Sequence, residues 1–196
     1  MLSADERRFL LGLADNSIRE GLASGAPLAV EVQSLSPHLA GPGSTFVTLK
    51  AGGQLRGCIG TLEAWRPLAE DCAENAFAAA FRDPRFPPVA AQEFPALDLH
   101  ISVLEPARPL IAATEAELLD QLRPGEDGLV LVEGHRRATF LPSVWEQLPE
   151  PALFLRHLKR KAGLPDDYWS PTLKFGRYQV EELHAVAGRV TSLSSP

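Results

Sequence analysis

The feature that most constrains the fold is a hairpin signal near the middle of the chain. Two runs typical of β-strands, 45–50 and 54–60, are separated by Ala51-Gly52-Gly53. The two glycines accept the positive φ angles that a tight turn between antiparallel strands requires. Because only antiparallel strands are joined by so short a turn, the chain must contain an antiparallel sheet.

The register of this hairpin follows from its loop. If residues 51–53 form a three-residue loop, Thr48 lies opposite Arg56 and Phe46 lies opposite Cys58. The alternation of side chains then puts Arg56 and Cys58 together on one face of the hairpin. The other face is predicted to be buried, and it is formed by Val47, Leu49, Leu55, Gly57 and Ile59.

Helices and further strands are expected on both sides of this hairpin. Ser3 and Glu6 form a capping box at the start of a helix over 3–22. Strict alternation predicts a strand over 97–104. The other expected elements are helices over 66–81, 114–121 and 152–162, a hairpin of 128–132 with 137–141, and a strand over 172–183. Strands grouped in hairpins indicate an α+β fold, with a largely antiparallel sheet packed with helices.

Length and composition narrow the class of protein. The chain has 196 residues, of which 45% are hydrophobic, and its formal net charge is −6. We expect one domain over 1–185, with two subdomains as an option, and a flexible tail over 186–196. The acidic balance disfavours a general nucleic-acid binder, which needs a basic surface. We recognise neither a membrane-spanning segment nor an export signal, and we therefore expect a cytoplasmic protein.

Two cysteines, Cys58 and Cys72, are too few for a disulfide framework. Neither their spacing nor that of the histidines is typical of a metal site, so we predict no metal and no cofactor. Cys72 lies on the apolar stripe of the helix expected over 66–81, where it is predicted to fill the core.

Residues 55–61, Leu-Arg-Gly-Cys-Ile-Gly-Thr, are the strongest candidate for a functional site, and we call them the signature segment. A guanidinium such as that of Arg56 stabilises a neighbouring thiolate, which makes Cys58 a better nucleophile. Gly57 and Gly60 lack side chains, so a ligand or another part of the backbone can come close. The alternative is a tightly packed strand in which the cysteine is a small buried hydrophobe.

A histidine is the first candidate partner for this cysteine. His100 shares the polar face of its strand with Asp98 and Ser102, either of which can orient its ring. If that face adjoins the face of Cys58, a cysteine–histidine pair becomes feasible. The alternative is an ordinary hydrogen-bonded surface histidine.

Asp83 and Arg85 flank Pro84 in the loop after the helix expected over 66–81. They can position a carboxylate or phosphate group of a ligand. Alternatively, Asp83 only stabilises the reversal of the chain. No nucleotide-binding glycine-rich motif, serine-hydrolase elbow or zinc-protease motif occurs in the sequence, so those three activities have no support.

Several segments together resemble the AMMECR domain family, whose bacterial and archaeal members are called AmmeMemoRadiSam system protein A. Beyond the signature segment, the resemblance includes Phe46–Leu49, Glu74–Phe86, His100–Pro106 and Phe154–Trp169. It implies a two-part α+β fold, a main body plus a smaller subdomain, with a cleft beside the signature segment. It also implies a modification pathway shared with a Memo-type protein and a radical S-adenosylmethionine protein, but it identifies no reaction.

Two hypotheses of different classes follow. In the first, the protein binds a small polar ligand near the signature segment, Arg56 contacts its anionic group, Cys58 is the nucleophile and His100 moves the proton. The other residues assigned to ligand binding are Gly57, Gly60, Thr61, Asp83 and Arg85. In the second hypothesis, the protein is a non-catalytic regulator or scaffold that binds a protein partner, and the signature segment is structural.

Overall fold

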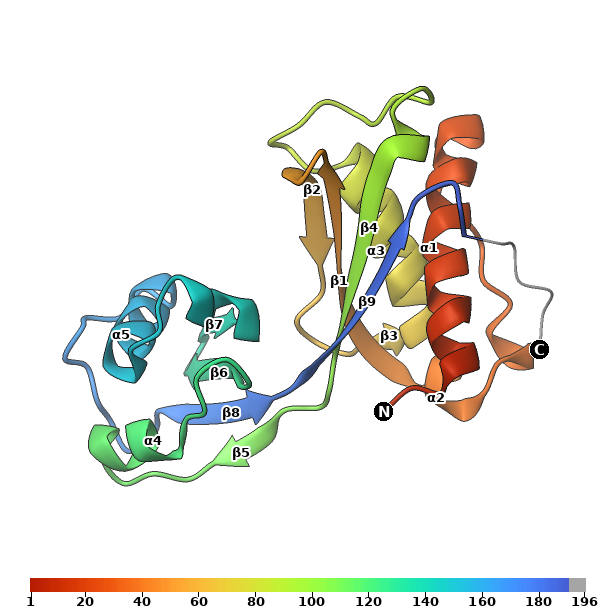
Figure 1. The fold of residues 1–196 in the computed structure, drawn as a ribbon. Helices are drawn as coiled ribbons and strands as arrows, with labels where there is room; N and C mark the ends of the chain where they lie inside the picture. The colour runs from red at the N-terminus through yellow and green to blue at the C-terminus, as the bar shows by residue number, and fades with distance from the viewer. Residues whose placement is uncertain (191–196) are drawn as a thin grey trace. The chain divides into compact units, whose positions relative to one another are not determined.

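The computed structural model describes residues 1–190, which form two units, each with its own sheet (Figure 1). The first unit comprises 1–104 and 181–190, and the second is the intervening segment 105–180. Helices combined with antiparallel strand pairs confirm the predicted α+β class. Within the described residues, no helix is long and apolar enough to cross a membrane.

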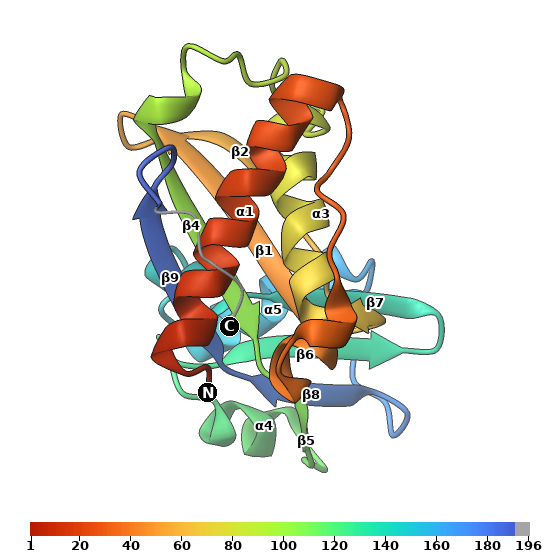
Figure 2. The ribbon, with the colours of Figure 1, turned by 90° about the vertical axis from the view of Figure 1, so that its right-hand side faces the viewer.

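The first unit contains a sheet whose strand order is β2-β1-β4-β9, with β3 also paired to β1. Its elements are α1 (Ala4–Ser24), a 3-10 turn at Val32–Ser34, α2 (Pro37–Ala40), β1 (Pro42–Ala51), β2 (Gln54–Gly60), β3 (Arg66–Pro67), α3 (Leu68–Phe81), a 3-10 turn at Phe94–Ala96, β4 (Leu97–Leu104) and β9 (Val180–Val186). Helices α1 and α3 cover one face of this sheet (Figure 2). The strand residues beneath them, such as Val47 and Leu99, are fully buried.

The second unit contains a sheet with the strand order β5-β8-β6-β7. Its elements are β5 (Arg108–Leu110), α4 (Glu115–Gln121), β6 (Gly128–Glu133), β7 (Arg136–Phe140), a 3-10 turn at Pro142–Glu146, α5 (Pro151–Lys161) and β8 (Lys174–Tyr178). A separate apolar core, which includes Leu129, Phe154 and Trp145, holds these elements together. The single strand predicted over 172–183 is in fact two strands, because the chain leaves one unit and enters the other near Gln179.

The register predicted for the first hairpin is wrong. Its turn is the two residues Gly52-Gly53, with φ angles of 55° and 79°, so Ala51 pairs with Gln54. The strands then continue with Lys50 opposite Leu55 but Leu49 opposite Gly57. Arg56 is therefore the extra residue of a β-bulge. The bulge brings Cys58 opposite Thr48, and it leaves Leu55, which was expected in the core, 41% exposed.

The end of the chain was expected to form a tail from residue 186 onward. Ala187 is fully buried, and its N–H donates to the carbonyl of Leu97 at 2.8 Å. The N–H of Gly188 donates to the carboxylate of Asp15 at 2.6 Å. These contacts belong to the first unit, whereas 191–196 lie outside the described residues.

Helix α3 packs directly against strand β2 at a glycine. A Cβ atom on Gly57 would lie 2.1 Å from the carbonyl oxygen of Ala79, far inside van der Waals contact. Because this oxygen belongs to the helix backbone, it cannot move aside as a side chain would. The absence of a side chain at Gly57 thus sets the distance between α3 and the sheet.

We predict that Gly57→Ala lowers the free energy of unfolding by about 3 kcal/mol, since it forces α3 away from β2. Gly60→Ala is the comparison on the same strand, because the atoms nearest to its Cβ belong to the side chain of Phe46, which can move by rotation about χ1, rather than to a helix backbone, so it should lower the stability less. Denaturant unfolding of both variants measures the difference. Equal stability of Gly57→Ala and the unmodified chain would contradict the close packing.

Candidate functional site

Cys58 lies on β2, which is an outer strand of the first sheet. Since the neighbouring Gly57 faces α3, the alternation of side chains directs Cys58 to the opposite face. Its partner on β1 is Thr48, and the partner of Thr48 on β4 is His100. The three side chains form one row on what we call the polar face, the side of the first sheet that is opposite α1 and α3.

The thiol of Cys58 is partly exposed and is held by a neighbour. The hydroxyl of Thr48 donates a hydrogen bond to the Sγ atom at 3.2 Å. Cys72, in contrast, is fully buried in the core as predicted, and burial raises the pKa of its thiol far above the ordinary value. Only Cys58 is therefore available for chemistry in the folded state.

The backbone of Cys58 is held by the pair Asp83 and Arg85. Its N–H donates to Asp83 Oδ2 at 2.9 Å, and its carbonyl accepts from the Arg85 guanidinium at 3.2 Å. Both peptide groups thus point away from β1, and this is why Thr48 and Cys58 form a non-hydrogen-bonded pair with close side chains. The two side chains act as a substitute for a further strand at this edge.

The carboxylate and the guanidinium of this clamp also bind each other. Arg85 donates to Asp83 through Nε at 2.9 Å and through Nη2 at 2.7 Å. These hydrogen bonds hold the pKa of Asp83 well below its ordinary value, although burial opposes the shift. The pKa of Arg85 is raised, chiefly by Asp83, with a smaller contribution from the side chain of Cys58. The clamp is therefore fully charged at neutral pH.

Arg56, which was expected to act on Cys58, is bound elsewhere. Its Nε donates to Glu93 at 2.7 Å, and its Nη2 donates to the carbonyl of Pro88 at 3.3 Å. The side chain is only 14% exposed, and its Nη1 is buried without a hydrogen-bond partner among the described residues. Arg56 thus anchors the loop that follows α3, and the cation in contact with Cys58 is Arg85.

His100 shares the row of Cys58 but is two strands away. With neighbouring strands about 4.8 Å apart, the two Cα atoms are separated by roughly 10 Å, with Thr48 between them. The ring of His100 lies 4.5 Å from that of His184 on β9. Burial, and then the charge of Lys50, lower the pKa of His100 below its ordinary value. At neutral pH the imidazole is therefore uncharged and can accept a proton.

The two polar neighbours expected to orient His100 have other partners. Ser102 donates to Glu182 on β9 at 3.0 Å, and Asp98 lies 3.9 Å from the Nε2 atom of His184. Burial raises the pKa of Glu182 above its ordinary value. The polar face therefore continues from β4 onto β9 as a set of paired polar groups.

The last two residues of the signature segment pack within the protein. A Cβ on Gly60 would lie 2.2 Å from the ring of Phe46, which occupies the space expected for a ligand. The hydroxyl of Thr61 accepts from the amide of Asn75 at 3.1 Å, and its N–H donates to the carbonyl of Thr45 at 2.9 Å. Both residues thus connect β2 to β1 and α3.

A buried polar network was missed at the level of sequence. Asp71 is fully buried on α3 and accepts from the N–H and the hydroxyl of Thr45 at 2.7 and 2.8 Å. Arg66 donates to the other oxygen of Asp71 at 2.9 Å, and Asn75 donates to the carbonyl of Thr45 at 3.0 Å. One signal in the sequence could have revealed this network: Asp71 and Asn75 are polar residues four positions apart, beside the apolar stripe of the helix expected over 66–81. Such a network fixes α3 on β1 because every buried group has a partner.

In residues 1–190, the structure contains no group of three or more His, Cys, Asp or Glu side chains suited to hold a metal ion. The row on the polar face presents a thiol, a hydroxyl and an uncharged imidazole.

We predict that Asp83→Asn lowers the free energy of unfolding by about 2 kcal/mol at neutral pH, because it removes a charged acceptor that is 2% exposed. The folded-state pKa of Asp83 is below that of the unfolded chain, so its contribution is complete above about pH 5 and is lost as the pH falls further. The difference between the two proteins should therefore shrink below about pH 4. Denaturant unfolding at several pH values measures it.

The control for this prediction is Asp5→Asn. Asp5 pairs with Arg8 on the surface, where an ion pair contributes about 0.5 kcal/mol. A pH-independent difference between Asp83→Asn and the unmodified protein would show that the charge of Asp83 does not stabilise the edge of the sheet.

Known proteins resemble this chain in sequence and in structure over nearly its whole length. A protein from Methanothermobacter thermautotrophicus is 37% identical over 93% of this chain and 96% of its own length. A protein from Thermofilum pendens is 35% identical over 92% and 90% of the two chains. The crystal structure of an uncharacterised protein from Pyrococcus horikoshii superposes with a TM-score of 0.82 at 31% identity, covering 96% of this chain and 95% of the other.

The sequence profile of one family, described as AMMECR1, matches residues 11–183. This range contains every candidate residue of the site, the first of which is Thr48 and the last His100. The resemblance inferred from the signature segment is confirmed, and the chain belongs to the AMMECR1 family.

Proposed function

We propose that the protein binds a small polar ligand on the polar face of the first unit and that Cys58 adds as a nucleophile to an electrophilic double bond of this ligand. A C–S bond forms, the π bond breaks, and its electron pair moves to the far atom of that bond. The observation that carries this proposal is the state of Cys58: a partly exposed thiol whose backbone is clamped at both peptide groups. A fixed backbone keeps the sulfur in one position, which is what a nucleophile requires. The hydroxyl of Thr48 further restricts its orientation.

Two neighbours complete the proposed site. His100, uncharged at neutral pH, is two strands from Cys58, so it takes up the proton of the thiol through the hydroxyl of Thr48, which lies between the two groups in the row, and returns it to the adduct. Lys50 is close enough to lower the pKa of His100, and it supplies the positive charge for an anionic group of the ligand. This role passes from Arg56 to Lys50 because Glu93 neutralises Arg56.

The pathway is proposed from the family resemblance. We assign the protein to a modification pathway whose other members are a Memo-type protein and a radical S-adenosylmethionine protein. In this pathway Cys58 holds the small molecule that the partners form or modify. Two free cysteines agree with a reducing compartment such as the cytoplasm.

A second candidate function has its own support. Gly57 and Gly60 accommodate α3 and Phe46, and Asp83 and Arg85 bind the backbone of β2. These four residues are fully explained by packing, as expected if the protein is a scaffold that binds a protein partner. The two candidates differ on whether Cys58 has a chemical role.

We predict that iodoacetamide labels Cys58 in the folded protein, while Cys72 reacts only after unfolding. Arg85→Gln should slow the labelling of Cys58, since it removes the donor to the Cys58 carbonyl and so loosens the clamp that positions the sulfur. Arg56→Gln is the matched control and should leave the rate unchanged. Mass spectrometry of the two cysteine peptides gives both rates. If Cys58 is labelled only on unfolding, the nucleophile proposal is wrong.

A further prediction concerns the proposed pathway. When the purified protein is incubated with the two partner proteins and S-adenosylmethionine, the peptide containing Cys58 should gain mass. Cys58→Ser should gain no mass and should prevent the three proteins from forming their small-molecule product. Cys72→Ser should behave like the unmodified protein. Full product formation by Cys58→Ser, together with an unchanged Cys58 peptide, would favour the scaffold function.

A further inference from the structure

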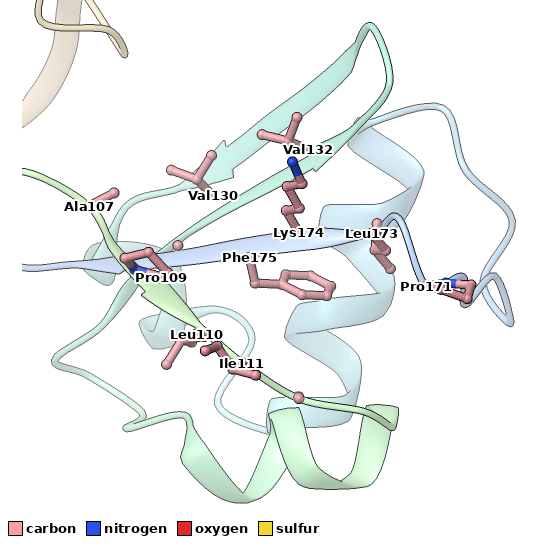
Figure 3. Close-up of a pocket in the computed structure, with 12 residues that line it drawn as sticks. Ala107, Pro109, Leu110, Ile111, Val130, Val132, Pro171, Leu173, Lys174 and Phe175 are labelled. Atoms are coloured by element: carbon pink, nitrogen blue, oxygen red, sulfur yellow. The ribbon is translucent and has the colours of Figure 1, made fainter.

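A groove of about 490 Å³ lies in the second unit, beside strands β5, β8 and β6 (Figure 3). Its walls are largely apolar and include Pro109, Val130, Val132 and Leu173. Small-molecule sites in proteins have volumes of about 300–1,000 Å³ and are mostly apolar, with a few polar groups that set specificity. The size and lining of the groove therefore fit a small ligand.

One wall of the groove is held in place by a carboxylate. The Oε1 atom of Glu133 on β6 accepts hydrogen bonds from the hydroxyls of Tyr168, Ser170 and Thr172 at 3.0, 3.1 and 2.7 Å. These bonds tie the segment 168–172 to the sheet. The same segment contributes Pro171 to the groove, so this wall is formed before any ligand arrives.

The opposite wall is equally fixed, although it exposes an apolar side chain. The carbonyl of Ile111 accepts from Gln121 at 3.0 Å, and that of Ala113 accepts from the indole of Trp169 at 3.1 Å. The N–H of Ala113 donates to Glu117 at 2.8 Å. Ile111 is nevertheless 88% exposed at the rim of the groove. A backbone held in three places thus presents a large apolar side chain at the rim of an apolar groove.

The groove contains a single charged side chain, that of Lys174. Figure 3 shows it beside Val132, its partner on β6. Among the described residues, no acidic group pairs with Lys174. Lys174 shares its face of the sheet with Val132, whereas the alternation of side chains directs Glu133, the next residue on β6, to the opposite face, where the three hydroxyls bind its Oε1 atom. A cation among apolar side chains selects a ligand that combines an anionic group with an apolar body.

The edge of this sheet disfavours a peptide as the occupant. β5 is the outer strand, and only three residues long. Its central residue, Pro109, has no N–H to offer to an added strand. Because peptides that bind along a sheet edge rely on such backbone hydrogen bonds, the ligand must be held by side chains instead.

We propose that this groove binds a small amphipathic carboxylate. Its apolar body lies against Val130, Val132 and Ile111, and its carboxylate pairs with Lys174. The residues involved all belong to the second unit, so the proposal stands apart from the function proposed for Cys58.

The test is a titration of the full chain with decanoate, followed through the amide NMR shifts of Ile111, Val132, Lys174 and Gly176. Decanol and decyltrimethylammonium serve as neutral and cationic probes of the same length. We expect saturable shifts at these amides, with decanoate bound about fivefold more tightly than decanol, the typical effect of one partly exposed ion pair. Lys174→Gln should remove this preference for decanoate over decanol. Ile111→Ser should lower the affinity for decanoate severalfold without changing the melting temperature of the protein.

Arg108→Gln is the control, since Arg108 is an exposed cation on β5 that does not line the groove. It should bind decanoate like the unmodified protein. Equal affinities for decanoate and decanol, an unchanged affinity in Lys174→Gln, or shifts that do not saturate would each overturn the proposal. It would also be overturned if an acidic, apolar peptide shifted the amides of β5 while decanoate did not.

Discussion

The architecture of the first unit depends on how its outer strand is completed. β2 leaves the N–H and carbonyl of Cys58 facing away from the sheet, and an open edge of this kind invites pairing with other chains. Asp83 and Arg85 satisfy both groups with one carboxylate and one guanidinium, which also bind each other. This one interaction protects the edge, fixes the loop after α3 and holds the only partly exposed thiol in a defined place.

Helix α3 is the element that makes this clamp feasible. Its carbonyl at Ala79 packs against Gly57, and its buried Asp71 and Asn75 bind Thr45 on β1. The helix is therefore fixed against both strands of the hairpin. The loop that follows its last residue, Phe81, places Asp83 and Arg85 beside β2. The residues from Glu74 to Phe86, which carry much of the family resemblance, are thus tied together by packing and hydrogen bonding.

The arrangement separates structural residues from those free to do chemistry. The glycines, the clamp and Arg56 are all occupied within the protein, whereas Cys58, Thr48 and His100 form a row of reactive groups on the polar face. In the second unit, the apolar groove with Lys174 is formed by residues outside the signature segment. The proposed site therefore uses few residues of the signature segment itself.

The sequence by itself determined the α+β class, most helices and strands, the burial of Cys72 and the position of Cys58 on a hairpin. These follow from local patterns, because periodicity and turn residues act over a few neighbours. It did not determine the bulge at Arg56, which changes the register and separates the guanidinium from the thiol. Nor did it reveal that Thr48 lies between Cys58 and His100, or that Arg85 contacts Cys58. Only the tertiary structure decided these, because they depend on the register in which the strands pair and on which distant side chain supplies a partner for a polar group.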